Sequence, residues 1–372
     1  MEKHRARDDE HSALGDSKNS DGFVKRHRKA FIACTCILVL PIVLIAAYVL
    51  VLNSSLKNID RISIDTSHDS RPADDSGENI LLMGVDQGNK VSDGTLEFNI
   101  AADSNRKVWP ADKYHSDTMM IVHLSKDRRD ISIVSIPRDS YVDVYDADGD
   151  KTGKNRVNEA LTQFGPSAAV TTIERLVGLR IDHLAMVDYQ SFEAITDALG
   201  GVNVYIPETV YYENSPRVAW QQGDLKLDGK AALAYVRERK KLPNSDYSRI
   251  RRQQNFLRAA LAKLKSNGTL ANPGRLKGTL DAVTKNLAVD EGWSGSDIRG
   301  LAFSLRGASG SDIPFVTLPI DGYSHMIDGI GSIVMPDMPK IAELTKAIRS
   351  NRVDHFIEKY PKQGLEDETK VR

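Results

Sequence analysis

Apolar runs of strand length recur along the chain from residue 79 onward, and stretches with helical spacing of apolar residues separate most of them. Such interleaving predicts an α/β sandwich around a mixed central sheet. The expected strands are 79–85, 118–124, 130–136, 181–187, 202–207, 314–320 and 331–336. The expected helices are 157–178 with a break at Gly165-Pro166, 190–199, 227–235, 246–264, 273–287, 294–306 and 337–350.

Polar residues are expected to gather at one end of this sheet. The second and third strands are joined by a short charged turn, which indicates an antiparallel hairpin and places Asp117 beside Arg138 and Asp139. If the first strand runs parallel to the third, Asp86 reaches the same end, where ligand sites of α/β sheets are common. A purely structural role, in which Arg138 only pairs with Asp139, stays open.

The helix 246–264 changes character along its inward face. The apolar part of that face consists of Ile250, Leu257, Leu261 and Leu264. Extended backward, the same stripe contains Asp246, Arg249 and Gln253. Charges on an inward face are costly unless they are paired or functional. Helix capping by Asp246 and a solvent-reaching Arg249 are the structural alternative.

Two further arginines, Arg237 and Arg239, precede this helix. In an extended segment they would project from one face and form a fork for phosphate oxygens.

The N-terminal region has the pattern of a membrane anchor. Residues 1–29 are polar and end in a basic cluster, and residues 31–52 carry no charge and are long enough to span a bilayer. The basic side of such a segment faces the cytoplasm. A cleaved signal peptide is the alternative, but the run is long for one. Residues 53–78 are polar and are expected to form a stalk.

Bulk composition excludes other classes. The formal net charge is -1 over 372 residues, so the chain lacks the strongly basic balance of a nucleic-acid binder. Its two cysteines, Cys34 and Cys36, both lie in the apolar run, which leaves the rest of the chain without disulfides or cysteine ligands.

The ordered motifs resemble the LytR-CpsA-Psr family over roughly residues 79–265. They are NILLMGVDQG, HSDTMMIV, SIPRDSYVDV, IDHLAMVDYQSFEAITDALGGVNVYIP, LDGKAALAYVRER and DYSRIRRQQ. The resemblance implies an α/β/α sandwich with a hydrophobic lipid pocket. It divides the chain into a cytoplasmic tail (1–29), a transmembrane helix (30–52), an extracellular stalk (53–78), an extracellular catalytic domain (79–355) and a polar C-terminal tail (356–372).

The resemblance also implies an activity. Such a protein is a phosphotransferase that moves a cell-wall glycopolymer from a polyprenyl-diphosphate carrier to a hydroxyl of peptidoglycan, with Mg²⁺ and at the cell membrane. A polyprenyl-diphosphate pyrophosphatase and a non-catalytic lipid-binding scaffold are the alternatives. Nucleic acid is not an expected partner.

The family's site residues match positions of this sequence. The resemblance implies that Asp86 and Asp117 hold the metal. The implied diphosphate ligands and catalytic residues are Arg138, Arg237, Arg239, Arg249, Asp246 and Gln253. In two places the chain departs from the family pattern, with His115 and Gly88 where arginines are usual. A phosphate contact through His115 would depend on pH, because histidine ordinarily titrates near neutrality.

The charge asymmetry around the apolar run gives a testable topology. We expect a cysteine placed at Ser76 to react with a membrane-impermeant thiol reagent in intact cells, because the basic cluster holds the N-terminus inside. Mass spectrometry of the labelled protein measures the reaction. Labelling that requires cell lysis would contradict an extracellular domain.

Overall fold

The computed structural model describes residues 59–67, 71–74, 77–87, 99–211, 217–238, 246–266, 273–307 and 313–371. The expected cytoplasmic tail and membrane anchor lie outside these ranges, as do Gly88 and Arg239. No helix among the described residues has both the length and the apolar content needed to cross a bilayer.

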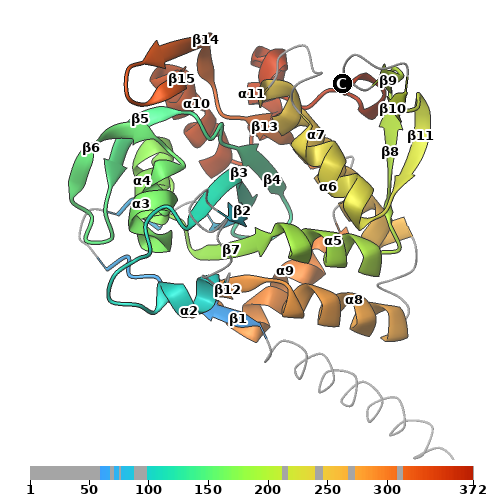
Figure 1. The fold of residues 1–372 in the computed structure, drawn as a ribbon, viewed down its shortest axis with the longest axis horizontal. Helices are drawn as coiled ribbons and strands as arrows, with labels where there is room; N and C mark the ends of the chain where they lie inside the picture. The colour runs from blue at the N-terminus through green and yellow to red at the C-terminus, as the bar shows by residue number, and fades with distance from the viewer. Residues whose placement is uncertain are drawn as a thin grey trace, which may run out of the picture. The chain divides into compact units, whose positions relative to one another are not determined.

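A mixed sheet of seven strands forms the centre of the domain, in the order β1-β12-β7-β2-β3-β4-β13 (Figure 1). The strands are β1 (Asp60–Ile62), β12 (Ala288–Asp290), β7 (His183–Asp188), β2 (Glu78–Gln87), β3 (Tyr114–Leu124), β4 (Ile131–Ser135) and β13 (Phe315–Thr317). Strand β3 is antiparallel to both β2 and β4, so β2 and β4 run in the same direction. The predicted mixed sheet and the shared end of β2 and β4 are therefore confirmed.

Helices cover both faces of the sheet. Leu81, Met83 and Ile121 pack in a core with helices α3 (Glu159–Phe164), α4 (Pro166–Val177) and α10 (Met338–Arg349). The alternate strand residues Ile80 and Met120 face a second core. Helices α7 (Asp246–Ser266) and α9 (Gly295–Gly307) cover that face. The alternation follows from the two-residue period of a strand.

A third core joins the sheet region to a smaller β layer. Helices α5 (Tyr189–Ala198) and α6 (Gly229–Arg237) pack there with the pair β8 (Val202–Ile206) and β11 (Gly223–Leu227). The remaining elements are β5 (Tyr141–Tyr145), β6 (Lys151–Arg156), β9 (Val210–Tyr211), β10 (Val218–Trp220), β14 (Ile320–Ile327), β15 (Gly331–Pro336), α2 (Ile100–Ser104), α8 (Pro273–Lys285), α11 (Val353–Lys359) and the 3-10 helices Pro361–Gln363 and Glu368–Lys370.

Local sequence sets the start of the two helices nearest the site. Asp188 ends β7 and caps α5, with its side chain accepting a hydrogen bond from the backbone N of Ser191 at 2.6 Å. Asp228 caps α6 in the same way through Ala231 N at 2.9 Å. Each cap satisfies a backbone donor that the first helical turn leaves free.

Two expected boundaries are wrong. The expected stalk, residues 53–78, contains β1, which pairs with β12 in the central sheet and fully buries Ile62. The expected C-terminal tail, residues 356–372, contributes the buried Phe356 and Val371. Both segments have a polar average composition, but the apolar side chains spaced among their charged residues are buried.

Two other expectations also need correction. Arg237 is the last residue of α6 and not part of an extended segment. The polar insertion expected over residues 87–116 contains helix α2 and the first residues of β3.

Candidate active site

A bulge between β2 and β3 places Asp117 at the carboxyl end of β2. Gly84 pairs with Thr118 and Val85 pairs with Ser116, so Asp117 has no partner of its own on β2. An extra residue of this kind bends the strand and redirects a side chain. Asp86 lies two residues beyond Gly84 on β2, opposite His115. The two carboxylates thus reach the same end of the sheet, as predicted.

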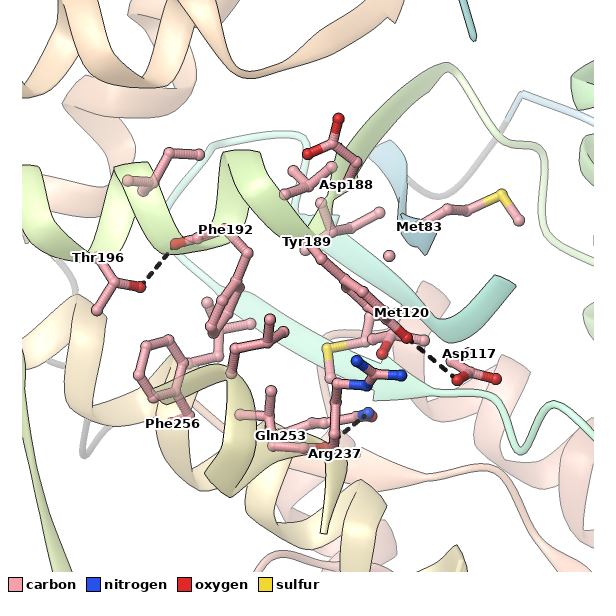
Figure 2. A pocket seen from close by; sticks show the side chains of 18 of the residues that line it. Met83, Asp117, Met120, Asp188, Tyr189, Phe192, Thr196, Arg237, Gln253 and Phe256 are labelled. Atoms are coloured by element: carbon pink, nitrogen blue, oxygen red, sulfur yellow. Dashed lines mark hydrogen bonds between the residues drawn. The ribbon is translucent and has the colours of Figure 1, made fainter. Parts of the chain in front are cut away.

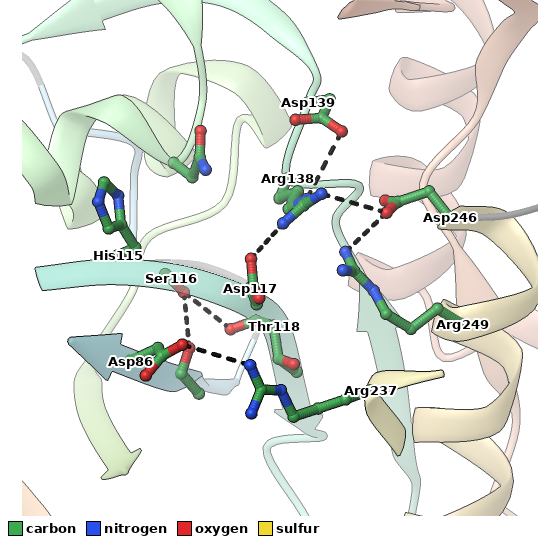
Figure 3. A network of polar contacts seen from close by, with 12 residues as sticks. Asp86, His115, Ser116, Asp117, Thr118, Arg138, Asp139, Arg237, Asp246 and Arg249 are labelled. Atoms are coloured by element: carbon green, nitrogen blue, oxygen red, sulfur yellow. Dashed lines mark hydrogen bonds and ion pairs between the residues drawn. The ribbon is translucent and has the colours of Figure 1, made fainter. Parts of the chain in front are cut away.

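Arg138 lies among three carboxylates at this end (Figure 3). It forms an ion pair and a hydrogen bond with Asp117. Its guanidinium also lies 3.5 Å from Asp139 and 3.5 Å from Asp246. Asp246 begins α7, so this arginine connects the loop after β4 to the helix predicted to border the site.

Arg249 is buried in the first turn of α7, with a side chain that is 4% exposed. Its Nη2 lies 2.8 Å from Asp246 Oδ1, but neither Nη2 nor Nε has a hydrogen-bond partner among the described residues. Arg138 Nε likewise has none. Buried donors without partners are unfavourable unless a ligand supplies the acceptors. The two guanidiniums therefore have donors available for an anion.

Arg237 approaches the same place from the end of α6. Its guanidinium carbon lies 4.2 Å from the centre of the Tyr189 ring, a cation–π contact, and its Nη2 lies 3.6 Å from Asp86 Oδ2. The Tyr189 hydroxyl donates to Asp117 Oδ2 at 3.3 Å. Tyr189 therefore links the arginine of one helix to the carboxylate of the central sheet.

The charges of the cluster shift one another's pKa values. Burial alone would raise the pKa of Asp117, but Arg138, Arg249 and the hydrogen bonds from Arg138 and Tyr189 hold it below its ordinary value. Burial lowers the pKa of Arg249, and the nearby aspartates only partly offset this. For Tyr189, burial and then the charges of Asp117 and Asp86 raise the pKa of the hydroxyl, so both carboxylates lie near it. Because its pKa is lowered, the Asp117 carboxyl group is ionised at neutral pH.

A cavity of about 400 Å³ opens beside this cluster, between the sheet and helices α5, α6 and α7. Figure 2 shows Phe192 and Phe256 toward one end and Asp117 with Arg237 toward the other. The apolar part is lined by Leu82, Met120, Phe192, Ile195, Leu199, Leu233, Phe256, Leu257 and Ala260. The polar end is lined by Asp117, Arg138, Arg237, Arg249 and Gln253. One continuous space therefore has a long apolar section and a cationic mouth.

The predicted site residues are mostly brought together. The cluster contains Asp86, Asp117, Arg138, Arg237, Asp246, Arg249 and Gln253, whose Nε2 donates to the Val236 carbonyl at 3.4 Å. His115 lies on β3 opposite Asp86, and its side chain contacts α3. Its Nδ1 lies 3.2 Å from Thr162 Oγ1, and it does not line the cavity formed by the described residues. A phosphate contact by His115 therefore stays a prediction, as does the role of Arg239.

Sequence reasoning missed two residues that shape the site. Tyr189 follows directly on the end of β7, and that position at a carboxyl strand end was the available signal. Gln254 is fully buried and donates to Ser135 Oγ at 3.0 Å and to the Val316 carbonyl at 3.1 Å. These bonds tie α7 to β4 and β13.

A model of the LytR_cpsA_psr family matches residues 47–350. The match covers more than half of the 372 residues, and the chain belongs to this family.

Known relatives are cell-wall proteins by name. The Corynebacterium glutamicum protein called cell wall biosynthesis protein LcpA is 31% identical over 299 residues, which cover 72% of this chain and 55% of LcpA. A Bacillus subtilis protein named polyisoprenyl-teichoic acid–peptidoglycan teichoic acid transferase TagV is 30% identical over 186 residues, or 48% of this chain and 47% of TagV. The chain thus spans about half the length of these two relatives.

A solved structure has the same fold. The crystal structure of B. subtilis TagV matches with a TM-score of 0.57 at 22% identity, over 76% of this chain and 99% of that one.

Proposed function

We propose that this protein is a phosphotransferase that moves a cell-wall glycopolymer from a polyprenyl-diphosphate carrier to a hydroxyl of peptidoglycan and releases polyprenyl phosphate. The observation that carries the proposal is the apolar cavity whose mouth is lined by three arginines. An apolar tube suits a prenyl chain, and guanidiniums suit the diphosphate attached to it. The name of the relative TagV, a teichoic acid transferase acting on peptidoglycan, supports the same reaction.

The residues of the mouth act by positioning and by charge. In phosphoryl transfer a protein mainly aligns the reacting groups and stabilises negative charge on the phosphoryl oxygens. The open donors of Arg138 and Arg249 hold nonbridging oxygens from the buried side. Arg237 is half-exposed and reaches the phosphates from the end of α6, held over Tyr189.

Magnesium is the proposed cofactor, with Asp86 and Asp117 as its protein ligands. Two carboxylates with substrate phosphate oxygens are the donor set that Mg²⁺ prefers, and the lowered pKa of Asp117 keeps that group ionised. The ion pairs around the site join four arginines (Arg138, Arg156, Arg237, Arg249) to five carboxylates (Asp86, Asp117, Asp139, Asp246, Glu159) among the described residues. The positive charges do not exceed the negative ones, so a bound diphosphate calls for added positive charge. When bound, the ion would neutralise charge on the phosphates.

The proposed location is the outer side of the cell membrane, with residues 30–52 as the anchor and the N-terminus in the cytoplasm. The uncharged run behind a basic cluster supports it. A membrane anchor would also keep the cavity near a lipid-linked donor. The labelling of a cysteine at position 76 tests this location.

Loss of either of the two predicted diphosphate-binding arginines, Arg237 and Arg239, should abolish most transfer. We expect Arg237→Ala and Arg239→Ala each to lower the transfer rate by about a hundred- to a thousandfold, the usual effect of removing one donor to a developing charge. Arg237→Lys should also be poorly active, because an ammonium lacks the planar fork. The double variant should lose less than the product of the single losses.

Transfer is measured with a prenyl-diphosphate-linked saccharide and a peptidoglycan fragment, with mass spectrometry of the products. The matched control is Arg129→Ala in the turn between β3 and β4, whose side chain is 85% exposed. Near wild-type transfer and lipid binding in both single variants would place the diphosphate elsewhere. Release of polyprenyl phosphate to water alone would favour the pyrophosphatase, and binding without turnover would favour the scaffold.

The metal proposal is tested through Asp117. Asp117→Ala should remove the dependence of transfer on magnesium together with nearly all activity, because one of two protein ligands is gone. Titration of Mn²⁺ followed by electron paramagnetic resonance, with donor present, measures binding independently of activity. Unchanged Mn²⁺ affinity in this variant would mean that the ion is held by other groups.

A further inference from the structure

Three polar residues border Arg138 from outside the apolar cavity. Asp139 follows Arg138 directly, Arg156 is the last residue of β6, and Asn158 lies in the turn between β6 and α3. The backbone N of Asn158 donates to the Arg138 carbonyl at 3.4 Å, so the turn and the arginine are in contact. Asp139, Arg156 and Asn158 do not line the cavity formed by the described residues. They therefore offer a second side of the phosphate site, away from the prenyl chain.

The carboxylate of Asp139 is held by charge and not by short hydrogen bonds to its arginines. Its oxygens lie 3.5 Å from Arg138 Nε and 3.8 Å from Arg156 Nη1, and both distances exceed the ordinary hydrogen-bond range. Its side chain is 19% exposed, so a ligand can reach it. Asp117, by contrast, accepts hydrogen bonds from both Arg138 and Tyr189. Asp246 lies 2.8 Å from Arg249 Nη2, so among the three carboxylates around Arg138 only Asp139 has no ion pair closer than 3.5 Å in the described part of the chain.

The surroundings of Asp139 favour proton uptake. Burial raises its pKa, Arg138 lowers it, Asp246 on α7 raises it, and Arg156 on β6 and Arg249 on α7 lower it, with a net rise. A carboxylate with a raised pKa is a stronger base and a more useful proton acceptor near neutral pH.

We propose that Asp139 is the general base that takes the proton from the attacking hydroxyl, an assignment that rests on the proposed phosphotransfer. The hydroxyl oxygen forms a bond to the phosphorus that carries the sugar. The bond from that phosphorus to the bridging oxygen breaks, and polyprenyl phosphate leaves with the electron pair. The hydroxyl proton ends on Asp139.

Asn158 completes the acceptor side of this site. It is 6% exposed, and its Oδ1 has no hydrogen-bond partner among the described residues. Buried amide oxygens are rarely left unpaired, so a hydroxyl of the acceptor is a suitable donor to it. Asn158 would thus position the acceptor beside Asp139.

The test is Asp139→Asn in the full chain, which removes the base and keeps the shape of the side chain. With a prenyl-diphosphate-linked saccharide and a peptidoglycan fragment, transfer should fall about a hundred- to ten-thousandfold while donor binding is unchanged. The wild-type rate should fall as pH drops through the pKa of Asp139, because the protonated acid cannot accept a proton, and the variant should lack this decline. The control is Asp143→Asn on β5, a residue paired with Lys151 at 2.9 Å, which should behave as wild type.

Further outcomes separate a base from a residue that only positions Arg138. Added formate should restore transfer in Asp139→Ala, because a small carboxylate can occupy the vacated space and accept the proton. Donor binding that falls together with the rate, a persisting acidic decline, or failure of formate to restore transfer would overturn the proposal. Release of polyprenyl phosphate to water that depends on Asp139 would support the base and contradict the proposed acceptor.

Discussion

Two guanidiniums, the buried one of Arg249 and the partly buried one of Arg138, impose the main physical constraint on this structure. Removing a charge from water is costly unless nearby groups replace the lost hydration. Asp117, Asp139 and Asp246 supply opposite charge, but donors on both arginines are left without hydrogen-bond partners. The positive charges of the two arginines are therefore compensated, but their hydrogen bonds are incomplete. A ligand with several phosphate oxygens supplies the missing acceptors.

Hydrogen bonds connect the helices around these arginines to the central sheet and to one another. Gln254 joins α7 to β4 and β13, and Gln253 joins α7 to the end of α6. A bulge in the sheet fixes Asp117, and the cap formed by Asp188 fixes the start of α5, where Tyr189 lies. Groups carried on strands and on the first turns of helices keep their positions better than groups on loops. The same elements form the apolar cavity, because it lies between the sheet and helices α5, α6 and α7.

Much of this arrangement could be predicted from the sequence. The short turn between two apolar runs was sufficient to bring Asp117 near Arg138. The polar start of an otherwise apolar helix stripe located Arg249 and Gln253 in the buried wall of the site. Both inferences depend on the spacing of apolar residues within short segments of the chain.

The rest depended on contacts between distant segments. Strand β1 has three residues and gains its stability from pairing with β12, far along the chain, so a polar stretch around it was expected to be a stalk. Arg237 was expected in an extended segment, but the alanine-rich helix before it continues for two more residues and ends at Arg237. The contact of Tyr189 with Arg237 joins two helices, so the position of Tyr189 after a strand could place it at this end of the sheet but could not predict the contact.

The most direct measurement is a crystal structure of the protein with a short prenyl diphosphate and magnesium. The account predicts that the diphosphate contacts Arg138, Arg237 and Arg249 and that the prenyl chain lies in the apolar section of the cavity, against Phe192 and Phe256. A prenyl chain bound outside this cavity, or a diphosphate that leaves the donors of Arg249 without partners, would contradict it.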